Sequence, residues 1–260
     1  MAAARSPSAS VGLALLAPSW ACAYELFAGF AMLGIGIEAL LQLVGGPPAL
    51  HITAGGLYLG LAAILYHYRA FWPQPFGWAN RITLIRGAAV MLLAGAGLFP
   101  EFLSAHVQTF VLLALGCLLL DGVDGWIARR TGASGAFGAR FDMEVDAFFL
   151  LVLSALIVAL DKAGSWALAI GLARYVFVIA QGVCPPLRRP LPASRLRKIA
   201  CVWQGATLLG CLWLGIGSAA ASSALLVSLA LLMLSFGRDI VWLLRRADRP
   251  LPAMGRQAID

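Results

Sequence analysis

Charged residues are scarce in this chain of 260 residues. Only 12% of the residues are charged, 61% are hydrophobic, and the mean hydropathy is +0.87. A soluble globular domain has roughly a quarter of its residues charged, so this composition excludes an ordinary soluble protein. It predicts an all-α integral membrane protein, folded as one compact bundle of helices.

Histidine and cysteine are few, and neither is arranged for metal binding. The three histidines lie near predicted helix ends. The five cysteines lie in or beside apolar runs, where we interpret them as small buried apolar side chains; they are Cys22, Cys117, Cys184, Cys201 and Cys211. The net charge of +7 comes mostly from arginine, and no basic run is interleaved with aromatic residues. We therefore expect no nucleic-acid partner, and we attribute this charge to cytoplasmic loops and contact with anionic membrane lipid.

Long apolar runs are abundant. Runs of about 20 residues predict eight transmembrane helices, at about 22–44, 51–69, 81–99, 104–129, 138–161, 164–184, 197–217 and 222–245. The segment FWPQPFGW between the second and third helices suits the membrane interface.

Arginine and lysine gather in alternate loops of this arrangement. The residues of one side are Arg69, Arg81, Arg129, Arg130, Arg140, Arg188, Arg189, Arg195, Arg197, Lys198, Arg245, Arg246, Arg249 and Arg256. On the other side Lys162 is the exception. The positive-inside rule then predicts that both termini face the cytoplasm. Residues 1–21 have features of a signal peptide, but their removal would invert this pattern, so we expect them to be retained.

Acidic residues concentrate between two apolar runs, in the stretch DGVDGWIARRTGASGAFGARFDMEVD at residues 121–146. Asp121 and Asp124 are spaced i, i+3, and Asp142 and Asp146 are spaced i, i+4, so each pair shares a helix face. The short loop between them predicts antiparallel helices whose four carboxylates converge. Each acid costs about 2.5–3.5 kcal/mol inside a membrane helix, and divalent cations would offset this cost. Oxygen ligands suit Mg²⁺, Mn²⁺ or Ca²⁺ rather than zinc.

The spacing of this stretch resembles the signature of the CDP-alcohol phosphotransferases, D-x-x-D-G-x-x-A-R, eight residues, then G-x-x-x-D-x-x-x-D. The chain meets it in full with Asp121, Asp124, Gly125, Ala128, Arg129, Gly138, Asp142 and Asp146. A weaker match, N-x-x-T-x-x-R, is formed by Asn80, Thr83 and Arg86, although helix capping explains Asn80 nearly as well. The resemblance implies a transferase of phospholipid biosynthesis. It would move the phosphatidyl group of CDP-diacylglycerol to the hydroxyl of a small alcohol and release CMP.

The resemblance covers residues 78–246 and implies a catalytic core of six helices there. Residues 1–77 would form an N-terminal extension with two transmembrane helices, and residues 247–260 a cytoplasmic tail. We expect an integral protein of a bacterial inner membrane with its active site facing the cytoplasm. Relatives are commonly dimers, so a homodimer is a further expectation.

The resemblance also implies roles for the motif residues. Two Mg²⁺ or Mn²⁺ ions would be held by Asp121, Asp124, Asp142 and Asp146. Asp146 would also act as the general base that takes the proton of the acceptor hydroxyl. The CDP group would lie beside Gly125, Ala128, Arg129, Thr131 and Gly138. Glu144 lies off the face of these acids and is interpreted as a supporting group.

The motif residues do not identify the acceptor alcohol. Arg195, Arg197 and Lys198 enter the seventh predicted helix, and such a cluster suits an acceptor with its own phosphate, such as glycerol 3-phosphate. Positive-inside topology and contact with lipid headgroups explain the cluster equally well. Arg174 lies in the middle of a predicted helix, so we expect it to face a polar cavity and pair with a carboxylate or a substrate phosphate.

Two alternatives follow from the same residues. The first keeps the chemistry but uses serine, choline or inositol phosphate as the acceptor. The second is a cation transporter or channel, which predicts acids spread along several helices rather than clustered on two.

Overall fold

The computed structural model of this chain describes residues 19–72, 76–131, 135–188, 195–213 and 216–245. Across these ranges the regular structure is helical and no strand is present, which confirms the predicted all-α class. The α-helices are α1 (Ser19–Val44), α2 (Leu50–His67), α3 (Trp78–Ala96), α4 (Pro100–Ala105), α5 (Val107–Thr131), α6 (Ala136–Ala159), α7 (Leu168–Val183), α8 (Arg195–Leu212) and α9 (Ser218–Arg245). Short 3₁₀ helices are η1 (Arg69–Phe71), η2 (Ser165–Ala167) and η3 (Pro185–Arg188).

In the described part of the chain, eight long helices correspond to the eight predicted spans, and their ends differ from the predicted ones by five residues at most. The short helix α4 is the exception. The fourth span was expected to begin at residue 104, but α5 begins at Val107. Pro100 starts a separate helix, as proline favours the first helical turn. His106 then takes a non-helical conformation, with φ −123° and ψ 28°, so the two segments do not merge.

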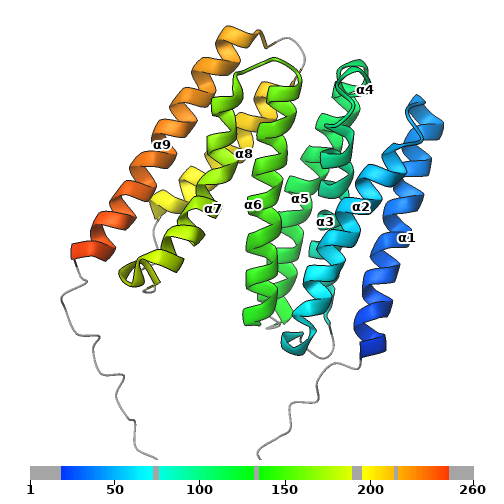
Figure 1. Ribbon diagram of the computed structural model, residues 1–260, viewed down its shortest axis with the longest axis horizontal. Coiled ribbons are helices and arrows are strands. Elements are labelled where there is room, and N and C mark those ends of the chain that lie inside the picture. The colour runs from blue at the N-terminus through cyan, green and yellow to red at the C-terminus, as the bar shows by residue number, and fades with distance from the viewer. Residues whose placement is uncertain (1–18, 73–75, 132–134, 189–194, 214–215, 246–260) are drawn as a thin grey trace, which may run out of the picture.

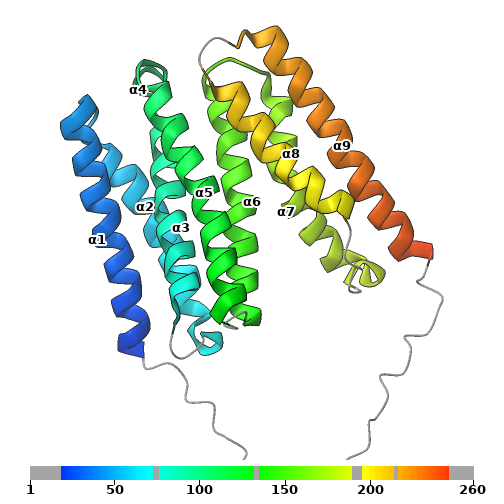
Figure 2. The same cartoon turned by 180° about the vertical axis from the view of Figure 1, so that it is seen from behind.

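The long helices run alternately up and down and stand side by side, with α1 at one edge and α9 at the other (Figure 1). From behind, α5 and α8 lie in front of α6 and α7 (Figure 2). We call one end of the bundle the motif end, because α5 finishes there at Thr131 and α6 starts there at Ala136. The start of α1 and the end of α9 also lie at the motif end, whereas α4 lies at the far end.

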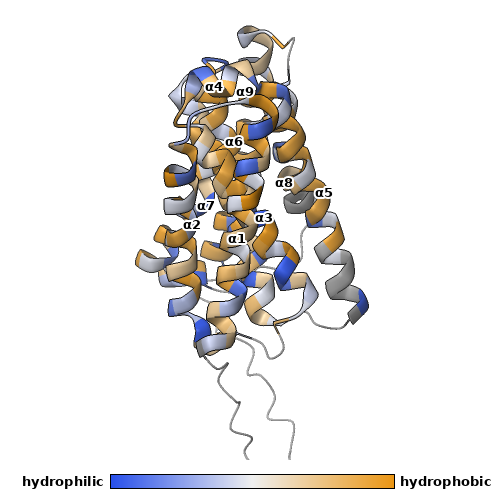
Figure 3. Cartoon of the chain, turned by 90° about the vertical axis from the view of Figure 1, so that its right-hand side faces the viewer, coloured by the Kyte–Doolittle hydropathy of each residue, from blue (hydrophilic) through white to orange (hydrophobic). Residues whose placement is uncertain are grey.

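The outward surfaces of the bundle are apolar. Among the described residues, four helical segments are long and apolar enough to cross a membrane, and they are Trp20–Val44, Leu50–His67, Ser165–Val183 and Ser218–Arg245. Two shorter apolar stretches lie on α5 and α8, at Val107–Val123 and Ile199–Leu212. Hydrophobic colours cover much of the helices in Figure 3. The chain is therefore an integral membrane protein built as a helical bundle.

The two helices α3 and α6 are the most enclosed. Among the described residues, Trp78 is the one exposed large apolar side chain of α3, and Met143 is that of α6. Helix α3 packs against α1, α2, α5 and α6, and α6 also packs against α7 and α8. Helices α6 and α7 come especially close at Gly171, where a Cβ would lie 2.3 Å from the Cα of Leu151. Small residues permit such close approach of membrane helices.

The first two helices are fastened to α3 by polar contacts as well as by packing. The guanidinium of Arg81 donates to both carboxylate oxygens of Glu25 on α1, with Nη2 2.6 Å from Oε1. The hydroxyl of Tyr58, which is fully buried on α2, donates to the carbonyl oxygen of Leu26 at 2.9 Å. These bonds hold α1 and α2 to the rest of the bundle at defined positions.

Lys162 lies between α6 and η2, away from the motif end, and its side chain donates hydrogen bonds to the end of α8. Its Nζ donates to the carbonyl oxygens of Cys211, Leu212 and Trp213 at 3.0, 3.3 and 2.8 Å. Cys211 and Leu212 belong to the last turn of α8 and Trp213 follows it, so no helical N–H remains to bond their carbonyls. A lysine at a helix C-terminus also interacts favourably with the helix dipole.

Replacing Lys162 by methionine should therefore destabilise the protein, because an unbranched side chain of similar size is kept while three carbonyls lose their donor. We expect a loss of about 1–3 kcal/mol, seen as a lower melting temperature of the purified protein in detergent. Lys162→Arg is the control, since it keeps the charge and the donors. A Lys162→Met protein that melts at the wild-type temperature would show that water satisfies the end of α8 equally well.

Candidate functional site

Two acids of the sequence motif and one arginine lie at nearly the same depth in the bundle, and a third acid, Asp142, lies one helical turn closer to the motif end. Asp121 is ten residues before the end of α5, and Asp146 is ten residues after the start of α6. Arg86 is eight residues after the start of α3, which also begins at the motif end. A helix rises about 1.5 Å per residue, so these residues lie about 12–15 Å from that end. Packing of α3 against both α5 and α6 then brings their side chains together.

The guanidinium of Arg86 is the point on which the three acids converge. Its Nη1 lies 3.1 Å from Oδ1 of Asp121 and 2.8 Å from Oδ1 of Asp142. Its Nη2 donates to Oδ1 of Asp146. One arginine thus binds carboxylates from two other helices, using the planar fork of donors that suits carboxylate groups.

The cluster has a closed side and an open side. The side chain of Arg86 is 1% exposed, whereas those of Asp121, Asp142 and Asp146 are 38%, 37% and 44% exposed. The cation therefore lies beneath the carboxylates, and the carboxylates face outward from it. A molecule that approaches from the open side meets the acids first, and Asp146 is the most accessible of them.

The carboxylates fit a divalent cation by chemistry and by spacing. One oxygen from each of Asp121, Asp142 and Asp146 lies within 4.8 Å of the others. Six-coordinate Mg²⁺ binds oxygen at about 2.0–2.1 Å, which places opposite ligands about 4.2 Å apart. Neighbouring ligands of such an ion lie about 3 Å apart, so the three oxygens would draw closer together around a bound cation. Three carboxylates against one guanidinium also leave two negative charges, which one divalent cation would balance.

Gly138 marks the closest approach between α3 and the start of α6. A Cβ at this position would lie 2.6 Å from Oδ1 of Asn80. The amide of Asn80 is itself held, since its Nδ2 donates to the carbonyl oxygen of Phe76 at 2.5 Å. Further along the same face, a Cβ at Gly87 would be 3.8 Å from Cγ2 of Val145. Helix packing is thus one reason for the glycine at position 138.

Glu144 faces a different neighbour from Asp142 and Asp146. Nη2 of Arg174 on α7 lies 2.5 Å from Oε1 of Glu144, and its Nε lies 3.4 Å from Oε2. Arg174 is nine residues before the end of α7 at Val183, so it lies at nearly the same depth as the acidic cluster. Helix α6 therefore presents acids to two partners, Arg86 on one side and Arg174 on the other.

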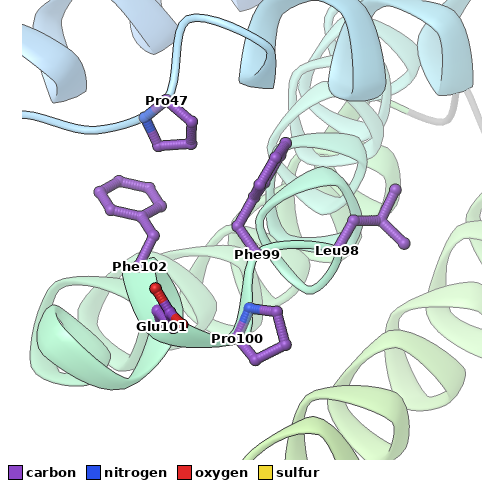
Figure 4. Close-up of a pocket in the computed structure, with 6 residues that line it drawn as sticks. All are labelled: Pro47, Leu98, Phe99, Pro100, Glu101 and Phe102. Atoms are coloured by element: carbon purple, nitrogen blue, oxygen red, sulfur yellow. The ribbon is translucent and has the colours of Figure 1, made fainter.

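A shallow apolar pocket lies at the far end of the bundle, not at the acids. Its lining residues are Pro47, Leu98, Phe99, Pro100, Glu101 and Phe102 (Figure 4). Pro47 comes from the connection between α1 and α2, Leu98 and Phe99 from the turn between α3 and α4, and the other three from α4. The end of α3 is ten residues, or about 15 Å, along the helix from Arg86, so this pocket lies apart from the acidic cluster.

Comparison with known proteins places these acids within a family match. The family model described as CDP-alcohol phosphatidyltransferase matches residues 76–237. This range is more than half of the chain and contains Arg86 and all four motif aspartates. The chain belongs to the CDP-alcohol phosphatidyltransferase family. A divalent metal site on the acids is in keeping with this membership.

An uncharacterized protein of Aquifex aeolicus (strain VF5) is 41% identical to this phosphatidyltransferase family member over 69 residues. The match covers 26% of the present chain, which spans about a third of the length of that relative. No solved structure matches the chain.

Several predicted site residues of this family member have side chains outside the described part of the structure. They are Asp124, Ala128, Arg129, Thr131, Arg195, Arg197 and Lys198. Their roles in binding metal, CDP or acceptor stay predictions, as do those of Gly125, Gly138 and Arg174. The structure brings Asp121, Asp142 and Asp146 together as expected from their spacing, and it pairs Arg174 with a carboxylate.

Arg86 is the site residue that the motif alone does not supply. It lies 35 residues before Asp121 in the sequence, and helix packing alone connects the two. The N-x-x-T-x-x-R pattern was the available signal. A second signal was the arginine itself, since a charge eight residues inside an apolar helix requires a partner.

Removing the Arg86 charge should make the fold dependent on divalent cations. In Arg86→Gln, three carboxylates face one another without their cation, which should cost about 2 kcal/mol, between the values for exposed and buried ion pairs. Ligands that bind the folded state stabilise it. Mn²⁺ should therefore raise the melting temperature of this variant by more than it raises that of the wild type.

Arg81→Gln is the matched control for this experiment. It removes an ion pair from the same helix, to Glu25 rather than to the acidic cluster. Its loss of melting temperature should be independent of Mn²⁺. Equal responses of the two variants to Mn²⁺ would contradict a role for Arg86 in balancing the charge of a cation site.

Proposed function

We propose that this protein is a membrane phosphatidyltransferase that uses CDP-diacylglycerol as donor and the hydroxyl group of a small polar alcohol as acceptor, with release of CMP. The observation that carries the proposal is the convergence of Asp121, Asp142 and Asp146 on Arg86, within the range matched by the family. Side chains separated by up to 60 residues meet at one depth of the bundle. The arrangement suits a polyanionic pyrophosphate near the membrane surface.

Each described residue has a task in this reaction. Asp121, Asp142 and Asp146 would hold Mg²⁺ or Mn²⁺ on their open side, and Asp124 would complete a site for two ions. The bound cations supply neutralisation of the pyrophosphate charge. Arg86 fixes the three carboxylates from the buried side, so their oxygens keep one geometry when substrate approaches.

The transfer itself is a substitution at phosphorus. The acceptor hydroxyl oxygen forms a bond to the phosphorus that carries diacylglycerol, the bond from this phosphorus to the oxygen of CMP breaks, and CMP departs. Asp146 takes the hydroxyl proton. Its side chain supports this role because it is the most exposed of the three, with one oxygen held by Arg86 and a second oxygen outside that bond.

A phosphorylated acceptor is our preferred substrate class, and glycerol 3-phosphate is its simplest member. Arg174 supports it as a second cation at nearly the depth of the acids, held by Glu144 on the side of α6 that faces α7. Arg195 and Lys198 belong to the first turn of α8, where they would meet a phosphate that enters from the aqueous side. Serine, choline and inositol phosphate are the alternatives.

We further propose that the motif end faces the cytoplasm of a bacterial cell, in its inner membrane. Described arginines at this end support the orientation under the positive-inside rule; they are Arg69, Arg81, Arg130, Arg140, Arg188 and Arg245. In this proposal residues 78–246 form the catalytic core and residues 1–77 an extension. The tail at 247–260 lies outside the described residues. A homodimer stays a prediction.

The base assignment is tested with purified protein, CDP-diacylglycerol, Mg²⁺ or Mn²⁺ and a panel of acceptors, by following CMP release. Asp146→Asn should lower kcat by about 10²–10⁴-fold, because the amide cannot accept the proton. Glu144→Gln is the control on the same helix and should keep most of the activity. Full CMP release by Asp146→Asn with the best acceptor would exclude Asp146 as the base.

The acceptor pocket is tested by its basic residues. Arg195→Ala and Lys198→Ala should each raise KM for a phosphorylated acceptor by about tenfold or more, the effect of losing one charge-assisted hydrogen bond. The KM for CDP-diacylglycerol should stay near the wild-type value. Unchanged acceptor KM in both variants would count against a phosphate pocket and in favour of an acceptor without phosphate.

A further inference from the structure

Four aromatic rings form a cluster at the motif end, beside the start of α6. The rings of Trp72 and Phe76 are stacked, with centroids 4.4 Å apart and planes at 23°. Phe137 on α6 lies 5.8 Å from Trp72 and 6.5 Å from Phe76. Phe141 follows one turn later, 6.0 Å from Phe137. Trp72, Phe76 and Phe141 are all at least nine-tenths buried, so we call these residues the aromatic cluster.

The cluster joins two parts of the chain that the family comparison separates. The family match begins at residue 76, so Trp72 lies before it, in the segment that follows α2. The indole is held from its own side, since Nε1 donates to the carbonyl oxygen of Leu65 at 3.1 Å. A residue of the N-terminal extension therefore packs directly on the helix that carries Asp142 and Asp146.

The position of this contact on α6 fixes the rotation of the helix. Phe137 and Phe141 are spaced i, i+4 and form one stripe. Gly138 and Asp142 are spaced in the same way and form the adjacent stripe, about 100° around the helix axis. The first stripe packs on Trp72, and the second lies against Asn80 and Arg86. With both stripes held, the acids can project only toward α3 and α5.

We infer that Trp72 is a positioning residue for the acidic cluster: its ring holds the first two turns of α6 in the rotation that brings Asp142 and Asp146 to face Asp121. The cation affinity of the carboxylates then depends on a residue of the extension that touches none of them. The part of this inference that concerns the rate of transfer rests on the proposed function, whereas the part that concerns cation binding does not.

The test measures Mn²⁺ binding to the full chain in detergent, without lipid substrate, by the electron paramagnetic resonance signal of free Mn²⁺. Trp72→Leu removes the ring and should weaken Mn²⁺ binding by about tenfold, the usual lower value for loss of a group that orients metal ligands. Trp72→Phe keeps a ring and should bind Mn²⁺ nearly as the wild type does. With CDP-diacylglycerol present, Trp72→Leu should lower kcat more than it changes the KM of the acceptor.

Phe110→Leu is the matched control for lost packing. Its ring is equally buried, at 2% exposure, on α5 and eleven residues from Asp121, which is about 16 Å along the helix. This variant should also melt at a lower temperature but should keep its Mn²⁺ affinity. If Trp72→Leu does not fold, Phe137→Leu removes a ring from the α6 side of the same cluster and should weaken Mn²⁺ binding in the same way.

The outcomes separate the two proposals. Equal Mn²⁺ affinity in Trp72→Leu and the wild type, or equal weakening in Trp72→Leu and Phe110→Leu, would overturn the positioning role. Weaker Mn²⁺ binding by Trp72→Leu alone would support it, even if the wild-type protein released no CMP with any acceptor. That last result would count against the proposed transferase and leave the role of Trp72 in place.

Discussion

A buried positive charge organises the centre of this protein. Arg86 is almost completely removed from solvent and lipid, and a lone guanidinium in such a place is costly. Its cost is offset by Asp121, Asp142 and Asp146, which in turn need a cation because they lie close together. The arginine and the acids offset one another's cost of burial. Their ion pairs therefore constrain the rotation and depth of α3, α5 and α6 relative to one another.

This constraint explains why the remaining helices are arranged around α3 and α6. These two helices keep few apolar side chains for lipid and are covered by their neighbours, with α1 and α2 on one side and α7 and α8 on the other. The outer helices carry the apolar surface that a bilayer requires. A polar centre and an apolar exterior are thus divided between helices, not only between the two faces of each helix.

Much of this arrangement could be predicted from the sequence. Apolar runs near 20 residues gave the long helices, since a helix needs that length to cross the hydrocarbon layer. The i, i+4 spacing of Asp142 and Asp146 and the short loop before them predicted that these two acids would face Asp121. The separate helix α4 was missed, because an apolar run does not show where the chain turns within it. The contacts of Arg86 with the acids could not be predicted, because they depend on packing between helices far apart in sequence. For Arg174 the sequence predicted a carboxylate or phosphate partner, but not that this partner is Glu144.

The aromatic cluster has a consequence for how this protein is divided into parts. Sequence similarity begins at residue 76, yet Trp72 and Phe137 are packed together across that limit. A chain that began at residue 76 would lack Trp72, so the rings of Phe76 and Phe137 would lose their contact with its indole. The border of the family match is therefore not a border in the packing of this protein, since α1 and α2 also pack on α3.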